Sequence, residues 1–369
     1  MKMPTDALRE EILQSGAISF ARFMELALYC PETGYYETHK DTVGRAGDFI
    51  TSVSTGSLFG ELLAFRFAEW LREFQISNFK FQIIEAGAHD GKLAADILSW
   101  LRTHRPELFS EMEYVLIEPS RRRQQWQQET LKPFPNVRWH SNFEHLKLKT
   151  KNSPLHGVLF SNELLDAFPV RRLGWDATAK NWFEWGVTLK GEQFVWARLA
   201  PDASGLALPA NIRQLPASLL AVLPDGYVSE HSPAAENWWR AAAGILARGK
   251  LLTIDYGFTA DEQLSPARRN GTLRAYHRHQ VSDDLLARPG DQDLTAHVNF
   301  TALQTAGEES GLQTEIFCPQ PQFLTRILQS AVTDPALADW NARRARQFQT
   351  LTHPEHLGRA FRVLVQSRT

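Results

Sequence analysis

Two short apolar segments that each end in a glutamate constrain the fold of this chain more than any other feature. They are residues 81–85 and 114–118, and a glycine-containing turn and a helical pattern at 92–101 lie between them. Short apolar strands that alternate with helices predict βαβ units in a parallel sheet. Such sheets bind ligands at the carboxyl ends of their strands, so we expect both glutamates at a binding edge.

The same alternation continues along the chain. We expect further elements in this order: a helix at 121–131, strands at 136–139 and 157–161, a helix at 234–247, a strand at 250–255, a helix at 300–310, and strands at 312–317 and 361–365. This pattern predicts the α/β class, with a doubly wound, Rossmann-like sheet.

Other parts of the chain do not follow this alternation of strands and helices, and they predict additions to the sheet. Antiparallel strand patterns indicate an inserted antiparallel β or mixed subdomain, and the chain before the first strand is mainly helical. We expect four regions: an N-terminal helical segment with a loop that covers the active site, 1–77; the first part of the core, 78–170; the inserted subdomain, 171–230; and the second part of the core, 231–369, with a loop insertion at about 258–298.

Composition excludes several classes of protein. Among 369 residues, 40 Lys and Arg against 42 Asp and Glu give a formal charge of −2, which argues against a nucleic-acid binder that works by general phosphate neutralisation. Two cysteines cannot build a disulfide framework or a cysteine-rich metal site, and we expect no metal. No apolar run is long enough for a membrane span, and no signal core is visible, so we expect a soluble, cytoplasmic protein.

The turn after the first strand separates two kinds of nucleotide-binding site. A dinucleotide fingerprint needs glycine at positions 87, 89 and 92, and the chain has Gly87, His89 and Lys92 there. That spacing makes a nicotinamide-dependent oxidoreductase the least favoured enzyme class. A Walker loop is excluded as well, because Leu93 rather than serine or threonine follows Lys92.

The alternative is the acid-x-Gly-x-Gly-x-Gly turn of adenosylmethionine-dependent methyltransferases. The chain has the acid, Glu85, and the outer glycines, Gly87 and Gly91, with His89 in the middle position. Glu118, at the end of the next strand, is placed to accept hydrogen bonds from ribose hydroxyls. The other interpretation is that Glu85 and Glu118 are surface acids at strand ends.

The strand at 157–161 is followed by a third group of polar residues. Asn162, Glu163 and Asp166 are expected over the carboxyl edge of the sheet, beside the predicted cofactor. A helix cap with acids in its first turn would also explain Asn162 and Glu163, but it explains the whole run less well.

Five segments in the right order make this chain resemble the MidA-like methyltransferases. Mitochondrial members of that family serve as complex I assembly factors and methylate a protein arginine. The segments span about 280 residues, which is a strong signal in combination. They are 20–29 with 34–36, 47–52 with 59–61, 162–170, 254–257 and 293–300.

The resemblance implies an S-adenosylmethionine-dependent enzyme on a class I methyltransferase sheet. It implies a protein arginine N-methyltransferase linked to complex I-type assembly, with a protein substrate such as a complex I-type subunit. It also places Gly47, Asp48, Thr51 and Asn162 among the cofactor-binding residues, in part because loop 47–52 is expected to enclose the cofactor and exclude water. The oligomeric state is left open.

The chain departs from the family pattern at two places. Residues 53–55 read Val-Ser-Thr where the family usually has Pro-Glu-Ile, and His89 stands where glycine is usual. These departures leave open a non-catalytic assembly or scaffold protein on the same fold. A small-molecule methyltransferase is the third alternative.

Methylation of an arginine suggests roles for three residues. A guanidinium stays protonated at neutral pH and is a poor nucleophile. Carboxylates that hold its other nitrogens would orient it, by analogy with known arginine methyltransferases, and Glu163 and Asp166 are the candidates. His297 could accept the proton that is lost after transfer, although a structural role is the commoner one for a lone histidine.

Overall fold

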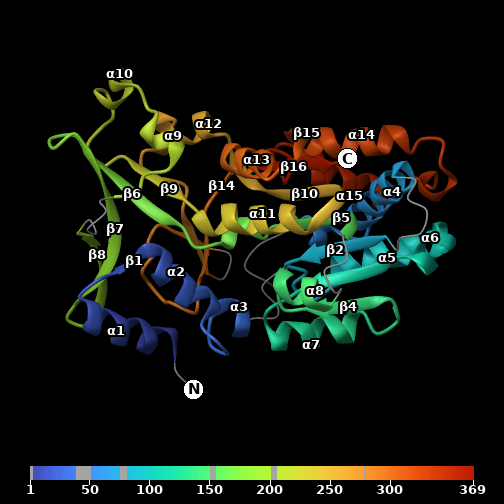
Figure 1. The fold of residues 1–369 in the computed structure, drawn as a ribbon, viewed down its shortest axis with the longest axis horizontal. Helices are drawn as coiled ribbons and strands as arrows, with labels where there is room; N and C mark the ends of the chain where they lie inside the picture. Colours follow the sequence, from blue (N-terminus) through green and yellow to red (C-terminus); the bar gives the residue numbers. More distant parts are fainter. Residues whose placement is uncertain (1–2, 39–50, 75–80, 150–154, 201–205, 278–279) are drawn as a thin grey trace. The chain divides into compact units, whose positions relative to one another are not determined.

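The strand–helix alternation expected between residues 81 and 161 is present in the computed structural model of the chain (Figure 1). The structure describes residues 3–38, 51–74, 81–149, 155–200, 206–277 and 280–369. Its contacts divide the chain into two units. The first unit holds 1–42, 166–237 and 257–302, and the second holds 43–165, 238–256 and 303–369.

The second unit is built on one mixed sheet. Its strands lie in the order β15-β16-β10-β5-β2-β3-β4, and the neighbours from β10 to β4 run parallel. The two strands β16 and β15 close the other edge in antiparallel pairing. The bounds are Gln82–Ala86 for β2, Glu113–Ile117 for β3, Val137–His140 for β4, Leu155–Asn162 for β5, Leu246–Phe258 for β10, Gln313–Pro319 for β15 and Phe361–Arg368 for β16.

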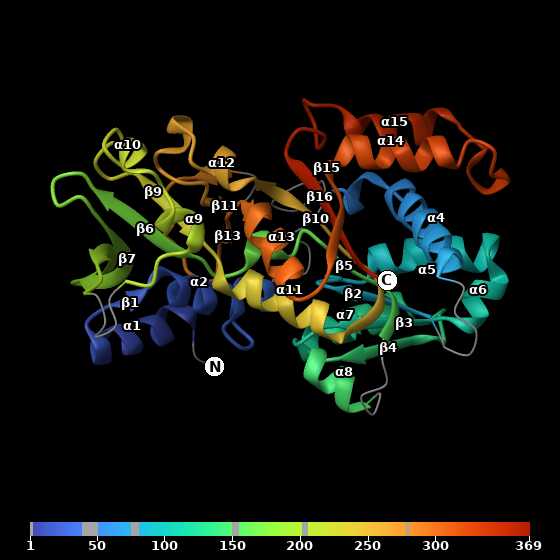
Figure 2. The ribbon, with the colours of Figure 1, turned by 45° about the horizontal axis from the view of Figure 1, so that its top comes forward.

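Successive side chains of each strand point to opposite faces of the sheet, and a different set of helices packs on each face. Ile83, Leu116 and Phe160 point to one face, where they join a core with residues of α4, α5 and α14. This face carries α4 (Leu58–Glu73), α5 (Lys92–His104), α6 (Pro106–Glu111), α7 (Arg121–Thr130), α14 (Gln320–Ser330) and α15 (Ala342–Thr352), and Figures 1 and 2 show α14, α15 and α4 side by side.

The opposite face is covered by α8, α11 and α13. Trp239 of α11 donates from its indole nitrogen to Gln366 Oε1 of β16 at 2.7 Å, and Trp238 packs on Phe143 of α8. The bounds are Phe143–Lys149 for α8, Pro233–Ile245 for α11 and Phe300–Glu309 for α13. Helices on both faces of a largely parallel sheet confirm the predicted doubly wound class.

Two glycines let three strands of this sheet come close together. Gly157 of β5 has φ +148°, and a Cβ there would lie 1.9 Å from the carbonyl oxygen of Gln82 in β2. Gly249 of β10 has φ +147°, and its Cβ would lie 1.9 Å from the carbonyl oxygen of Gly157. No side chain can be accommodated at either place without moving the backbone that carries the site.

The first unit contains antiparallel sheets, as expected for the inserted segment. Five strands pair as β1-β7-β6-β9, with β8 on β7, and three more pair as β12-β11-β13. The pairing of β1 with β7 was not expected from the sequence. The bounds are Ile18–Ser19 for β1, Arg171–Asp176 for β6, Asn181–Lys190 for β7, Gln193–Arg198 for β8, Val228–His231 for β9, Arg274–His277 for β11, Gln280–Ser282 for β12 and Asp293–Thr295 for β13.

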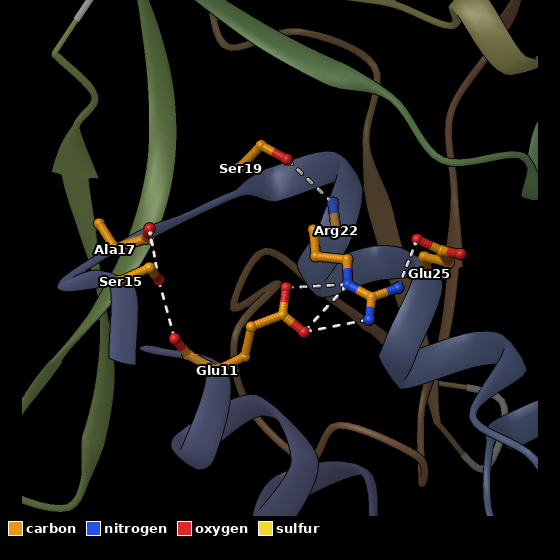
Figure 3. A network of polar contacts seen from close by, with 6 residues as sticks. All are labelled: Glu11, Ser15, Ala17, Ser19, Arg22 and Glu25. Carbon is orange, nitrogen blue, oxygen red and sulfur yellow. Dashed lines mark hydrogen bonds and ion pairs between the residues drawn. The ribbon is translucent and has the colours of Figure 1, made fainter. Parts of the chain in front are cut away.

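The helices of the first unit include α1 (Pro4–Ser15), α2 (Phe20–Tyr29), α3 (Tyr35–Thr38), α9 (Ala210–Arg213), α10 (Ala217–Leu220) and α12 (Ala260–Gln263). One arginine joins the first two of them. Arg22 of α2 donates to both carboxylate oxygens of Glu11 in α1, at 3.0 to 3.1 Å, and to Glu25 at 2.8 Å (Figure 3). Ser19 caps α2 by accepting from the Arg22 amide at 3.1 Å. Arg22 therefore takes part in the cap through its backbone and joins the two helices through its side chain.

The remaining pieces are short. Gly257 and Phe258, at the end of β10, pair in parallel with β14 (Val298–Asn299) in the first unit. Four 3₁₀ turns occur among the described residues, at Val53–Thr55, Leu165–Ala167, Pro266–Arg268 and Pro335–Leu337. Within the described parts of the chain, no helix combines the length and apolarity that crossing a bilayer requires.

The close approach at Gly157 generates a stability prediction. Gly157→Ala should lower the free energy of unfolding by about 3 kcal/mol, because a Cβ would strain the backbone and strike the Gln82 carbonyl. The control is Gly244→Ala in α11, where a Cβ meets nothing within 4 Å. That variant should raise the free energy of unfolding by about 0.5–1 kcal/mol through helix propensity. Urea unfolding, monitored by circular dichroism, measures the free energy of unfolding of both variants. Equal changes in the two variants would contradict the role of the close approach at Gly157.

Candidate functional site

The pairing of β2 with both neighbours sets the geometry of the site. Ala86, the last residue of β2, lies opposite Ile117 of β3 and Ser161 of β5. Glu118 and Asn162 are the next residues on those two strands. The turn after β2 therefore leaves the sheet between Glu118 on one side and Asn162 on the other.

The turn itself depends on three left-handed residues. The φ angles are +78° at Gly87, +47° at His89 and +84° at Gly91, where α5 begins. A side chain at the His89 position costs about 1–2 kcal/mol of backbone strain, which a glycine would avoid. A Cβ at Gly87 would lie 2.8 Å from the side chain of Leu164. The conformation and the packing against Leu164 both favour glycine at position 87.

Glu85 is a buried carboxyl at the end of β2. Its side chain is 3% exposed, and Oε2 accepts a hydrogen bond of 2.5 Å from the Tyr114 hydroxyl. Burial raises the pKa of Glu85 to about 8, although the Tyr114 hydrogen bond acts in the opposite direction. At neutral pH this carboxyl therefore holds a proton for most of the time.

Glu118 is equally buried but has cationic and amide donors around it. Oε1 accepts from the Ser120 amide at 2.9 Å and from Arg123 Nε at 3.0 Å. Oε2 accepts from Gln127 Nε2 at 3.1 Å. The sequence identified Glu118 as a candidate, but neither Arg123 nor Gln127 carried a signal there, because both sit in a helix of mostly polar residues.

Glu163 follows β5 in a left-handed conformation, with φ +50°. Its amide donates to the Ile254 carbonyl at 2.9 Å, and its Oε1 accepts from Asn162 Nδ2 at 3.1 Å and from the Ser52 amide at 3.2 Å. Burial raises the pKa of Glu163 to about 8, and the negative charge of Asp255 adds to the shift. This acid is held in one orientation by two donors at the edge of the sheet.

Asn162 and Asp255 complete the edge next to Glu163. The Oδ1 atom of Asn162 is buried and has no hydrogen-bond partner among the described residues. A buried acceptor of this kind suits a donor group on a ligand. Asp255 is fully buried, and its Oδ2 accepts from the amides of Leu164 and Leu165 at 3.2 and 2.8 Å, so it fixes the turn after β5.

Of the loop predicted to enclose the cofactor, only the end is described. Gly47 and Asp48 lie outside the described residues, whereas Thr51 is buried and exchanges hydrogen bonds with Ser54 at 2.9 to 3.2 Å. Within the described end of this loop, Ser52 contacts Glu163 through its backbone amide. A backbone donor carries no residue-type signal, so the sequence could indicate the loop but not this contact.

Asp166 belongs to the first unit. It is 7% exposed, and its carbonyl accepts from the Ala296 amide at 2.8 Å. In the same unit the Tyr36 hydroxyl donates to Asp293 Oδ1 at 2.7 Å. Burial raises the pKa of Tyr36, and the charges of Asp293 and Asp166 raise it further. Asp166 therefore lies within electrostatic range of a tyrosine–aspartate pair.

His297 also belongs to the first unit, and its ring is stacked on Phe258 at 4.7 Å. Its amide donates to Thr272 Oγ1 at 3.1 Å. Burial lowers the pKa of His297 to about 4, so the imidazole is neutral at physiological pH. The same burial makes it a weak proton acceptor.

The second unit thus gathers Glu85, Gly87, Gly91, Glu118, Asn162 and Glu163 at the carboxyl edge of β3, β2 and β5. No group of three potential metal-ligating side chains occurs among the described residues. Buried carboxyls, an unpartnered amide oxygen and a glycine turn suit a ligand that carries hydroxyl donors and positive charge.

Comparisons with known proteins agree with this chemistry. Residues 62–318, about seven tenths of the chain, match the family model described as S-adenosyl-L-methionine-dependent methyltransferase. A solved structure from Burkholderia thailandensis, bound to S-adenosyl-homocysteine, shares 32% sequence identity and has a TM-score of 0.82. The match covers 99% of this chain and 92% of that one.

Named relatives are more distant but cover most of the chain. The "Protein arginine methyltransferase NDUFAF7 homolog, mitochondrial" of Drosophila melanogaster is 27% identical, over 97% of this chain and 83% of its own length. The "Protein arginine methyltransferase NDUFAF7, mitochondrial" of Mus musculus is 29% identical, over 80% of this chain and 68% of its own length.

The raised pKa of Glu85 predicts how stability depends on pH. Between its ordinary value near 4.5 and about 8, the folded state keeps a proton that the unfolded state releases. The free energy of unfolding should therefore fall as pH rises from 5 to 8 and level off above that. Glu85→Gln should make this fall shallower, as measured by urea unfolding at several pH values. The exposed Glu111→Gln is the control, and an unchanged slope in Glu85→Gln would contradict the assignment.

Proposed function

The chain belongs to the family of S-adenosyl-L-methionine-dependent methyltransferases, and from that premise we propose that it methylates an arginine side chain of a protein. One observation carries the proposal. Glu163, a carboxyl at the carboxyl edge of the sheet, is oriented by the Ser52 amide and the Asn162 side chain. The names of the Drosophila and mouse relatives, protein arginine methyltransferase, support the choice of acceptor.

The residues at the edge of the sheet fit the cofactor. When bound, adenosylmethionine supplies a methyl group on a positively charged sulfur. We propose that Glu118 accepts from the ribose hydroxyls, and that the buried Oδ1 of Asn162 accepts from the cationic amino acid end. Glu85, with the turn from Gly87 to Gly91, would form the wall beside it, and Gly47, Asp48 and Thr51 remain proposed parts of the enclosing loop.

Glu163 would act on the acceptor rather than on the cofactor. A guanidinium is planar and presents several N–H donors, which a carboxylate can accept in pairs. A grip on two of its nitrogens would hold the third in line with the methyl group and would draw positive charge away from it. The hydrogen bonds from Ser52 and Asn162 keep this carboxyl in one orientation, so little conformational entropy is lost on binding.

Two residues of the first unit have proposed roles in the same reaction. Asp166, three residues after Glu163, is proposed as the second carboxylate for the guanidinium. His297 is proposed to accept the proton that leaves the methylated nitrogen. Because its pKa is about 4, it would hold that proton only briefly before passing it to solvent.

The identity of the protein substrate is a further proposal. The resemblance to complex I assembly factors supports a subunit of a complex I-type enzyme. A non-catalytic scaffold is not favoured, since the family match and the ligand of the Burkholderia structure both point to a methyltransferase. The cytoplasmic location stays a prediction of the sequence.

The test is transfer of labelled methyl groups from adenosylmethionine to cell extract. We expect a labelled protein that releases methylarginine on hydrolysis, and no label with Gly87→Val, whose side chain would strike Leu164. Label in small molecules alone would favour the small-molecule enzyme, and no label at all would contradict the proposal.

Glu163→Gln should separate binding from chemistry. The variant keeps the shape of the side chain and both hydrogen bonds to Oε1, so its affinity for S-adenosyl-homocysteine should stay within about twofold of the parent. Methyl transfer should fall by about a hundredfold or more, because the charge that orients the guanidinium is lost. Glu144→Gln, with its side chain 80% exposed, is the matched control. Turnover equal to the parent would remove Glu163 from the mechanism.

Transfer should also depend on pH through the same residue. Glu163 must be ionised to hold a guanidinium, and its pKa is about 8 in the unliganded protein. The rate at saturating cofactor should therefore rise with pH to a plateau, with a midpoint at or below about 8 because a bound cation favours the ionised form. A flat profile between pH 6 and 9 would contradict the assignment.

A further inference from the structure

Gln127 is a polar side chain with no exposed surface, in the middle of the mostly polar helix α7. A buried amide is costly unless each of its polar atoms finds a partner. The partners of this amide identify a role that neither the sequence nor the family match assigns to it.

The Gln127 amide makes three hydrogen bonds that use both of its ends. Its Nε2 donates to the His89 carbonyl at 3.0 Å and to Glu118 Oε2 at 3.1 Å, and its Oε1 accepts from Trp139 Nε1 at 3.1 Å. The orientation of the amide is unambiguous, because an indole nitrogen can only donate and a carbonyl can only accept. One side chain thus bridges the glycine turn and the acid of the next strand.

Packing brings the backbone of Gln127 against the same turn. A Cβ placed on Gly91 would lie 3.4 Å from the Cα of Gln127 and 3.3 Å from the side chain of Leu131. The absence of a side chain at Gly91 therefore lets α7 approach the turn. Helix α7 contacts this segment at both ends, by a hydrogen bond to the His89 carbonyl and by packing against Gly91. Gln127 therefore adds a direct side-chain link between the turn and Glu118 to the pairing of β2 with β3.

We propose that Gln127 is a positioning residue for the cofactor, which sets the spacing between the glycine turn and the ribose-binding carboxylate. The inference rests on the proposed contact of Glu118 with the ribose hydroxyls. Gln127 itself touches neither the methyl group nor the acceptor. Without its amide, the His89 carbonyl and Glu118 Oε2 would each lose a donor, and the ligand would have to order both groups as it binds.

The first measurement is the affinity of Gln127→Met for S-adenosyl-homocysteine by calorimetry. Methionine keeps the length of the side chain and its packing against Gly91 but removes both donated hydrogen bonds. We expect binding about tenfold weaker, an increase of similar size in KM for adenosylmethionine, and kcat at saturation within about twofold of the parent. Gln128→Met, on the exposed face of the same helix, should bind as the parent does.

Trp139→Phe distinguishes the loss of the two hydrogen bonds donated by Gln127 from a general loss of packing. This variant removes the third partner of the amide but leaves both donations from Nε2 in place. It should weaken binding by less than about threefold. If Trp139→Phe weakens binding as much as Gln127→Met, the effect is structural and the proposal is wrong.

Ligand dependence gives the sharpest readout. An S-adenosyl-homocysteine analogue that lacks the ribose 2′-hydroxyl should lose less affinity in Gln127→Met than the parent ligand does, since part of the contact with Glu118 is already absent. Equal losses for the two ligands would overturn the proposal. If Gln127→Met does not fold, Gln127→Asn serves instead, because an amide one carbon shorter cannot reach both acceptors.

Glu118→Gln distinguishes the assignment of Glu118 to the ribose from the positioning role of Gln127. If this variant binds S-adenosyl-homocysteine as the parent does, the ribose assignment fails, and the positioning role fails with it. If Glu118→Gln weakens binding and Gln127→Met does not, only the role of Gln127 is wrong.

Discussion

The parallel pairing of β2 with both β3 and β5 is the constraint on which the rest of the site depends. Ala86 lies opposite Ile117 and Ser161, so three strands end at the same level, and each is followed at once by a turn or a polar residue. A slip of one residue in either pairing would turn Glu118 or Asn162 to the other face of the sheet. The glycine pair Gly157 and Gly249 protects this register, because the backbones approach too closely there for any side chain.

Three glutamates lie near this edge, and each is accommodated in a different way, with Glu85 and Glu118 buried and Glu163 half-buried. Glu85 has a tyrosine hydroxyl and a raised pKa, Glu118 has an arginine and two further donors, and Glu163 has a backbone amide and an asparagine. Burial raises the pKa values of Glu85 and Glu163, and a cationic ligand placed beside them would favour their ionised forms. A chain with a formal charge of only −2 can therefore hold several carboxyls at one edge of its sheet that ionise when a cationic ligand binds.

The sequence predicted the strands that local residue patterns determine, but it did not predict contacts between segments that lie far apart in the chain. The strands at 81–85 and 114–118 were predictable because their apolar residues are short runs that end in acids, and the structure confirms both within one residue. The pairing of β1 with β7 could not be predicted, since a strand of two residues has no periodicity. Gln127 carried no signal for a similar reason: a glutamine in a polar helix has meaning only once the turn, Glu118 and Trp139 surround it.

The pairing of β1 with β7 also has a consequence for biosynthesis. Ile18 pairs with Val187, and Phe20 and Phe23 of α2 pack on Trp196 and Phe194 of β8. At about 5–20 residues per second, the ribosome needs on the order of ten seconds or more to make the intervening ~170 residues. During that interval the apolar face of α2 has no partner from β8, so the nascent chain exposes an aggregation-prone surface that is a natural target for chaperones.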